Sequence, residues 1–252
     1  MYLPRPGESN IGERGAMLSN ETALVLLSGG QDSTTCLAWA LENFRLVETV
    51  GFQYGQRHVI ELSCRERVRD KIRQVNRAWD QRLGEDRVLD ASILSSLSTT
   101  ALTSSAAISV NPDGLPTTFV PGRNIFFLIL AAVVAHQRNI RHIVSGVCET
   151  DFSGYPDCRD DTIKAIQLAL NGAMDRRFVL DTPLMWVDKA ETFSLAQSLG
   201  GDPLIELILE ETHTCYLGDR EHRHDWGYGC DDCPACELRK AGFFKWKRDG
   251  VN

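Results

Sequence analysis

The chain has 252 residues, of which 43% are hydrophobic and 24% are charged, a balance that excludes a disordered or fibrous protein and can supply one sizeable core. The formal net charge of −7 argues against an extended basic surface that binds nucleic acid, so a free small molecule is the expected substrate. The longest apolar stretch, IFFLILAAVVA at 125–135, has 11 residues and is too short to cross a bilayer, which predicts a buried helix and no membrane partner.

The N-terminal segment 1–20 is polar and contains several Gly and Pro residues, with no charged-then-apolar signal sequence. We therefore predict a flexible N-terminal extension and a cytoplasmic protein. The eight cysteines, in a chain without an export signal, favour metal ligands or free thiols over disulfides.

Strand-like and helix-like segments alternate after this extension. The predicted strands are 23–27, 47–54, 87–90, 141–147 and 177–184, and the predicted helices are 33–41, 61–75, 123–137, 161–170 and 189–199. Asp188 and Glu191 form a capping-box pattern before the last of these helices, and Gly200 is expected to end it. Residues 92–121 are expected to form a long loop that can fold over a site.

This alternation predicts an α/β fold with a doubly wound, mainly parallel sheet of the Rossmann type and helices on both faces. We expect residues 21–209 to form this α/β domain and residues 210–252 to form a small metal-binding region with a C-terminal helix. Ligands of such sheets bind at the carboxyl ends of the strands, so the loops after 27, 147 and 184 should share one rim.

The segment SGGQDS at 28–33 lies between the first strand and the first helix. The paired glycines allow a tight turn, and the backbone N–H groups together with the positive helix end can bind an anion such as a pyrophosphate. Asp32 would repel phosphate unless a cation lay between them, which implies magnesium. The alternative interpretation is a simple turn that caps a helix.

Four of the cysteines have the spacing C-x14-C-x2-C-x2-C near the C-terminus: Cys215, Cys230, Cys233 and Cys236. Four thiolates offer zinc a closed tetrahedral site, which indicates a structural role because catalysis needs an open position. An iron–sulfur cluster or free thiols are the alternatives. Three nearby histidines could replace one cysteine as a ligand: His213, His222 and His224.

The SGGxDS pattern resembles the PP-loop of the ATP pyrophosphatases, whereas neither a Walker A loop nor a GxGxxG motif is present in the sequence. Members of that family cleave ATP between its alpha and beta phosphates and thereby adenylate an oxygen of the substrate. On this resemblance the ATP-binding residues are Leu27, Ser28, Gly29, Gly30, Gln31, Asp32, Ser33, Thr34, Thr35, Cys36 and Leu37.

Further segments resemble one branch of that family, the 7-cyano-7-deazaguanine synthases. They are FQYGQRH (52–58), TTFVPGRN (117–124), GVCETDFSGYPDCRD (146–160), TPLMWVDKAET (182–192) and THTCY (212–216) with the cysteine cluster. The resemblance implies that ATP and ammonia convert 7-carboxy-7-deazaguanine into its nitrile through an adenylated carboxylate and an amide, with no direct contact to nucleic acid. The 14-residue gap after Cys215 and the N-terminal extension depart from the family pattern.

Three residues are expected to be catalytic on this basis. Asp32 would reach magnesium, Lys189 would neutralise phosphate charge, and Arg123 would recognise phosphate or carboxylate. A surface lysine and a surface ion pair are the alternatives for the last two. The expected substrate-binding residues are Tyr54, Asp151, Phe152, Tyr155, Asp157 and Arg159, and the alternative for the acidic segment among them is a solvent-exposed loop.

Two other functions fit parts of the pattern. A PP-loop enzyme that adenylates a tRNA base would share the glycine loop but would need a basic face. A zinc-knuckle interaction module with an inactive nucleotide site would share the cysteines. The sequence does not determine the oligomeric state, although sheets of this type often form homodimers.

Overall fold

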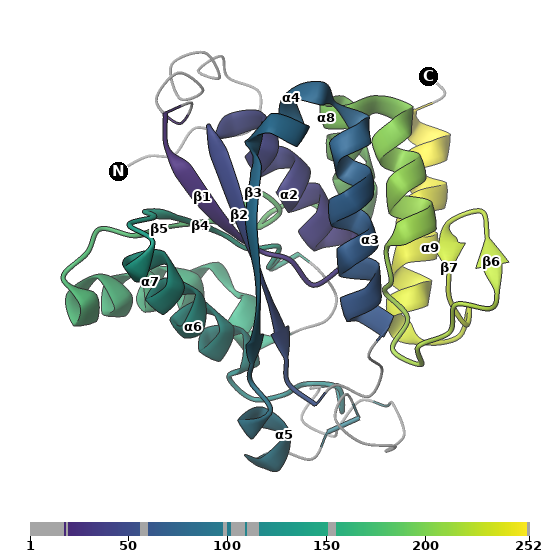
Figure 1. The fold of residues 1–252 in the computed structure, drawn as a ribbon. Coiled ribbons are helices and arrows are strands. Elements are labelled where there is room, and N and C mark those ends of the chain that lie inside the picture. The colour runs from purple at the N-terminus through teal and green to yellow at the C-terminus, as the bar shows by residue number, and fades with distance from the viewer. Residues whose placement is uncertain are drawn as a thin grey trace.

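A parallel sheet of five strands forms the centre of the molecule (Figure 1). The computed structural model describes residues 18, 20–55, 60–97, 100, 101, 109, 116–150 and 155–250. The strands are β1 (Thr22–Leu26), β2 (Leu46–Gln53), β3 (Leu83–Asp90), β4 (His142–Val144) and β5 (Val179–Asp181), in the order β3-β2-β1-β4-β5. The chain adds β2 and β3 on one side of β1 and then β4 and β5 on the other side, so the strand order switches between β1 and β4. Ligands of such sheets bind at this switch point.

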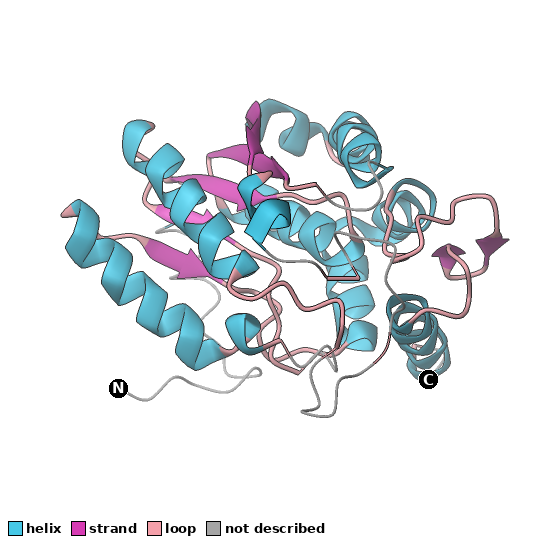
Figure 2. Ribbon diagram, turned by 90° about the horizontal axis from the view of Figure 1, so that it is seen from below, coloured by secondary structure: helices cyan, strands magenta, loops and turns pink. Residues whose placement is uncertain are grey.

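Helices cover both faces of this sheet, which confirms the predicted doubly wound fold; Figure 2 shows the two layers from below. The helices are α2 (Gln31–Asn43), α3 (Ile60–Val75), α4 (Arg77–Arg82), α5 (Ile93–Leu97), α6 (Arg123–Gln137), α7 (Asp160–Met174), α8 (Lys189–Glu211) and α9 (Pro234–Asp249), with a 3-10 turn at Pro156–Cys158. None of the described helices combines the length and the apolar character that a bilayer crossing requires.

Consecutive residues of β1 pack into two separate cores. Ala23 and Val25 lie in the core beneath α2, α3 and α8, whereas Leu24 lies in the core beneath α6 and α7. Side chains alternate between the faces of a strand, so an apolar run such as TALVL must be covered on both sides. The buried central strand therefore ends at a rim that both layers of helices surround.

Helix α8 differs from the prediction at its end. The capping box of Asp188 and Glu191 is present. The first helical segment ends at Gly200, as predicted, because Gly201 breaks the helix with φ of 61°, but a second helical segment that contains Pro203 follows and continues to Glu211. Glycine tolerates the left-handed backbone at the break, and proline fits the first turn of the following helical segment.

The C-terminal region packs against the main body through α9. Phe243 of α9 contacts Phe193 of α8 with 5.6 Å between ring centroids, and both belong to the same buried cluster as Val25 of β1. The 14-residue gap after Cys215 contains an antiparallel ribbon of β6 (Arg223–His224) and β7 (Gly227–Tyr228). The proposed boundary between residues 209 and 210 stays a prediction.

Two short helices were not predicted. Helix α4 lies between α3 and β3, and α5 occupies the start of the expected long loop 92–121. Most of the remainder of that loop, and all of the N-terminal extension except residues 18 and 20, lies outside the described residues.

Candidate active site

A cavity of about 300 Å³ opens at the carboxyl ends of β1, β2 and β4. Its walls are the loop after β1, the first turns of α3 and α6, the loop after β4, the first residue of α8, and residues 213–216. The loops after β1 and β4 were predicted to share this rim, and the structure brings them into contact: a Cβ at Gly146 would lie 3.3 Å from the backbone N of Ser33.

Two serine hydroxyls hold the glycine loop closed. The Oγ atoms of Ser28 and Ser33 are 3.0 Å apart, Ser33 Oγ donates to the Gly30 carbonyl at 3.1 Å, and Ser28 Oγ accepts from the Gly30 N–H at 3.3 Å. Gly29 has φ of 93°, and a Cβ there would lie 2.5 Å from the Glu61 carbonyl oxygen, so only glycine fits. No side chain caps α2. Its first-turn N–H groups can therefore bind a phosphate.

Lys189 and Asp32 form an ion pair at the end of this loop. Lys189 Nζ donates to Asp32 Oδ2 at 2.6 Å, and the Lys189 side chain is 15% exposed, which excludes a solvated surface lysine. The other carboxylate oxygen, Asp32 Oδ1, is buried and accepts no hydrogen bond from the described residues. A carboxylate oxygen without a described partner, next to the loop proposed to bind phosphate, is a suitable ligand for magnesium, which prefers oxygen ligands such as carboxylates.

Arg123 begins α6 and lies between two tyrosines of the cavity wall. Its Cζ atom is 5.8 Å from the ring centroid of Tyr54 and 5.8 Å from that of Tyr155, so both rings can make cation–π contacts. The Nε atom is buried without a hydrogen-bond partner among the described residues. Arg123 is therefore a cavity residue with an unused donor, and not a member of a surface ion pair.

Aromatic side chains also line this cavity. Phe52 and Phe127 stack with 4.2 Å between ring centroids and 1° between planes, and Tyr54 packs on Phe127 at 5.4 Å. The hydroxyls of Tyr155 and Thr118 are 2.6 Å apart, which fixes the Tyr155 ring. Flat apolar surfaces of this kind suit a planar heterocycle.

Only some of the predicted substrate-binding residues line the cavity. Tyr54 and Tyr155 line the cavity. Asp157 does not: its buried carboxylate accepts the Asn124 N–H at 2.9 Å and so caps the first turn of α6. Arg159 is exposed at the start of α7 and is likewise not a cavity residue. Two of the predicted residues lie outside the described residues: Asp151 and Phe152.

Only part of the predicted ATP-binding segment lines the cavity. Six of its residues line the cavity: Leu27, Ser28, Gly30, Gln31, Asp32 and Ser33. The later residues enter the core as α2 continues, and each has no exposed surface: Thr34, Thr35, Cys36 and Leu37. Gly29 lies behind the loop, against α3.

Glu61 is a cavity residue that the sequence analysis did not identify. It belongs to the first turn of α3 and lines the cavity. Burial raises the pKa of its carboxyl to about 7, and the Arg123 guanidinium offsets part of this increase. A glutamate at the start of a charged helix resembles any solvated helix residue, so no local pattern could have identified it.

The four predicted metal ligands come together in the C-terminal region. The Sγ atoms of Cys215, Cys230, Cys233 and Cys236 all lie within 4.8 Å of one another, and none of these cysteines forms a disulfide. Tetrahedral zinc with Zn–S bonds near 2.3 Å requires sulfurs about 3.8 Å apart. Two of the pairs, Cys230–Cys236 at 3.9 Å and Cys233–Cys215 at 4.0 Å, are close to that separation.

The nearby histidines have other partners. His213 Nε2 lies 2.9 Å from the Cys215 carbonyl, His224 Nε2 lies 2.9 Å from the Gly229 carbonyl, and His222 pairs with Asp219. The cysteine set alone therefore fits a closed structural metal site.

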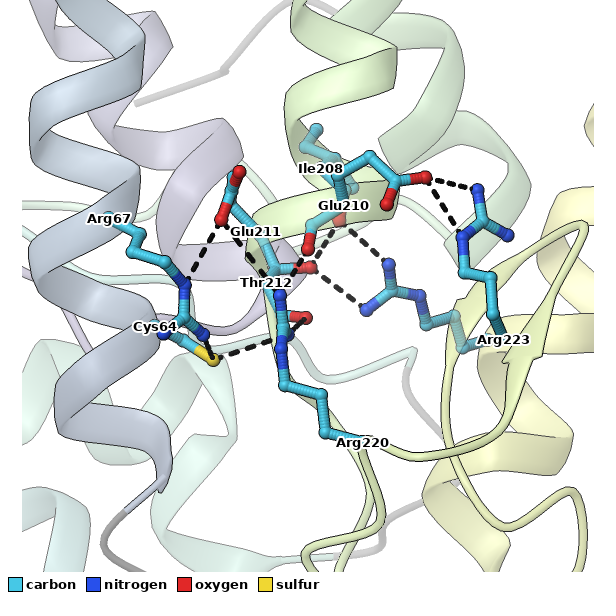
Figure 3. Close-up of polar contacts among 9 residues, drawn as sticks. Cys64, Arg67, Ile208, Glu210, Glu211, Thr212, Arg220 and Arg223 are labelled. Atoms are coloured by element: carbon cyan, nitrogen blue, oxygen red, sulfur yellow. Dashed lines mark hydrogen bonds and ion pairs between the residues drawn. The ribbon is translucent and has the colours of Figure 1, made fainter.

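This region also holds the glycine loop in place. The His213 N–H donates to the Gly29 carbonyl at 3.0 Å. Figure 3 shows how the segment before His213 is anchored: Arg220 donates to the Thr212 carbonyl at 3.1 Å and Arg67 of α3 pairs with Glu211 at 3.1 Å. The buried Arg239 of α9 donates to Thr212 Oγ1 at 2.9 Å. The metal region and the phosphate seat are therefore one connected unit.

A family model described as "Queuosine biosynthesis protein QueC" matches residues 22–247. The chain belongs to the QueC family. It is 62% identical over 232 residues to a 7-cyano-7-deazaguanine synthase of Halorhodospira halophila, which covers 92% of this chain and 94% of that one. A 7-cyano-7-deazaguanine synthase of Gluconobacter oxydans is 62% identical over 231 residues, with the same coverage of both chains. Membership of the QueC family confirms the resemblance that the motifs indicated.

The fold of this QueC family member was also compared with solved structures. A 4-thiouridine synthetase in complex with RNA and ATP has a TM-score of 0.47 and 21% identity, covering 74% of this chain and 42% of that one. This similarity is too low to transfer the role of any residue.

Proposed function

We propose that the protein is an ATP-dependent ligase that converts 7-carboxy-7-deazaguanine and ammonia into 7-cyano-7-deazaguanine, the product named by its QueC relatives. The observation that supports this best is the Lys189–Asp32 pair beside the glycine loop, in a cavity that aromatic side chains also line. The cavity thus offers charged groups for a triphosphate and flat surfaces for a fused ring.

In the first step, a carboxylate oxygen of the substrate attacks the alpha phosphate of ATP and pyrophosphate leaves. The N–H groups at the start of α2 and the Lys189 ammonium stabilise the negative charge that builds up on the phosphates. Asp32 Oδ1 would hold magnesium, whose positive charge would offset the phosphate charge further.

Ammonia then attacks the activated carbonyl, AMP leaves with the carboxylate oxygen, the nitrogen loses one proton, and the amide forms. Activation of the amide oxygen by a second ATP in the same cavity releases pyrophosphate, and loss of AMP and of both amide protons then gives the nitrile. Each nitrile therefore consumes two ATP molecules and one ammonia. Structural zinc bound by the four cysteines would hold residues 213–216 against the glycine loop.

The test is a turnover assay with purified, zinc-loaded protein, magnesium, ATP, ammonium and the acid. We expect AMP and pyrophosphate to appear with the amide and then the nitrile, and Asp32→Asn to abolish all of them while zinc content is unchanged. Release of AMP only with tRNA would indicate a tRNA-modifying enzyme instead, and a complete lack of AMP would indicate a non-catalytic zinc module. The cytoplasm is the proposed location, and a homodimer stays a prediction.

A further inference from the structure

The Glu61 carboxylate lines the cavity without a partner. No hydrogen bond or ion pair to its side chain occurs within the part of the chain that the structure describes, although the side chain is only partly exposed and that surface borders the cavity. A carboxylate in such surroundings is costly unless donors reach it. The described residues supply no such donor, so a ligand of the cavity is the candidate to supply it.

The residues around Glu61 indicate which kind of ligand fits there. Arg123 is close enough to influence the Glu61 carboxyl electrostatically. The rings of Tyr54 and Tyr155 flank Arg123. A planar group bound among the aromatic residues of this cavity can present one edge to the Glu61 carboxylate.

A carboxylate accepts two hydrogen bonds side by side and donates none. The pyrimidine edge of a deazaguanine carries two neighbouring donors, the ring N1–H and the 2-amino group, and so matches both oxygens. The corresponding edge of adenine carries one donor and one acceptor, and its ring nitrogen would face a carboxylate oxygen. The cavity binds both ring systems in the proposed reaction, and only one of them suits Glu61.

We propose that the Glu61 carboxylate recognises the N1–H and 2-amino edge of the deazaguanine substrate. This assignment rests on the proposed function, and Asp157, one of the expected substrate-binding residues, is not available for this role. The Asp157 carboxylate is already used by the cap of α6.

The test compares two ligands and two variants by calorimetric titration of the zinc-loaded protein. The ligands are 7-carboxy-7-deazaguanine and 7-carboxy-7-deazahypoxanthine, which lacks the 2-amino group. We expect the unmodified protein to prefer the first by about 10- to 100-fold, as for a hydrogen bond to a charged group. Glu61→Gln should reduce this preference to within about threefold, because an amide retains only one acceptor. Glu66→Gln, at an exposed position of the same helix, should leave it unchanged.

Binding of ATP in the same samples separates the other outcomes. Retained ATP affinity and zinc content in Glu61→Gln would show that the variant is folded, and Glu61→Ala would repeat the test if it were not. An unchanged preference for the 2-amino group, or loss of ATP affinity with normal binding of the acid, would overturn the assignment. If the unmodified protein bound neither acid, the proposed function itself would fail.

Discussion

The desolvated carboxyl of Glu61, which has no partner among the described residues, should make the protein less stable at alkaline than at acidic pH. Its pKa is about 7 in the folded protein and 4.5 when solvated. The folded state therefore binds more protons than the unfolded state between these values, so the free energy of unfolding falls as the pH rises through this range. One pKa unit corresponds to about 1.4 kcal/mol, which places the upper limit of the loss at about 3 kcal/mol.

Replacement of Glu61 by Gln removes the titration and keeps the size of the side chain. At pH 5 both proteins carry a neutral group there and should unfold at similar urea concentrations. At pH 8 the variant should be more stable, by up to about 3 kcal/mol. The groups that face Glu61 do not obscure this difference: Arg123 stays charged, and burial raises the pKa of Tyr54 to about 12.

Urea unfolding followed by circular dichroism, at several pH values between 5 and 8, measures this difference. Glu66→Gln is the matched control, because Glu66 is exposed on the same helix and its replacement should shift stability by less than about 0.5 kcal/mol at every pH. If the stability of Glu61→Gln relative to the unmodified protein were the same at pH 5 and pH 8, the carboxyl would not be held unpaired and desolvated, and the reasoning would be refuted.

Four further outcomes follow from the site. Lys189→Met should lower kcat by about 100-fold without changing zinc content, because it removes the cation beside the phosphates, and a stopped assay of AMP release would measure this; full activity would exclude that role. Gly29→Ala should abolish ATP binding in a titration, because its Cβ would lie 2.5 Å from the Glu61 carbonyl; normal binding would mean that the loop can move aside. Chelation of zinc should lower both the melting temperature and the ATP affinity, because His213 bonds to the glycine loop; loss of stability alone would show that the two are independent. Asp157→Ala should cost about 1 kcal/mol in urea unfolding by removing the cap of α6, and it should not alter the preference for the 2-amino group, which would change if Asp157 bound substrate.

Local patterns were sufficient for most of the framework. The alternation of apolar strands with amphipathic helices predicted the parallel sheet, and the capping box predicted where α8 begins, because these signals lie within a few residues of one another. The cysteine cluster and the glycine loop were likewise recognised from residue types and their spacing in the sequence. Helix α4 and the continuation of α8 beyond Gly201 were missed, since a short helix and a helix interrupted by Gly and Pro carry no clear period.

The sequence by itself identified the residues on which the proposed chemistry depends: the glycine loop, the aspartate within it and four cysteines with the spacing of metal ligands. Only the tertiary structure decided which side chains share the cavity. Lys189 contacts Asp32 across 157 positions of the chain, Asp157 caps α6, and Glu61 lines the cavity without a partner among the described residues. The direction of a side chain and the burial of its charge depend on segments far apart in the sequence, and these segments become neighbours only when the sheet and both layers of helices have assembled.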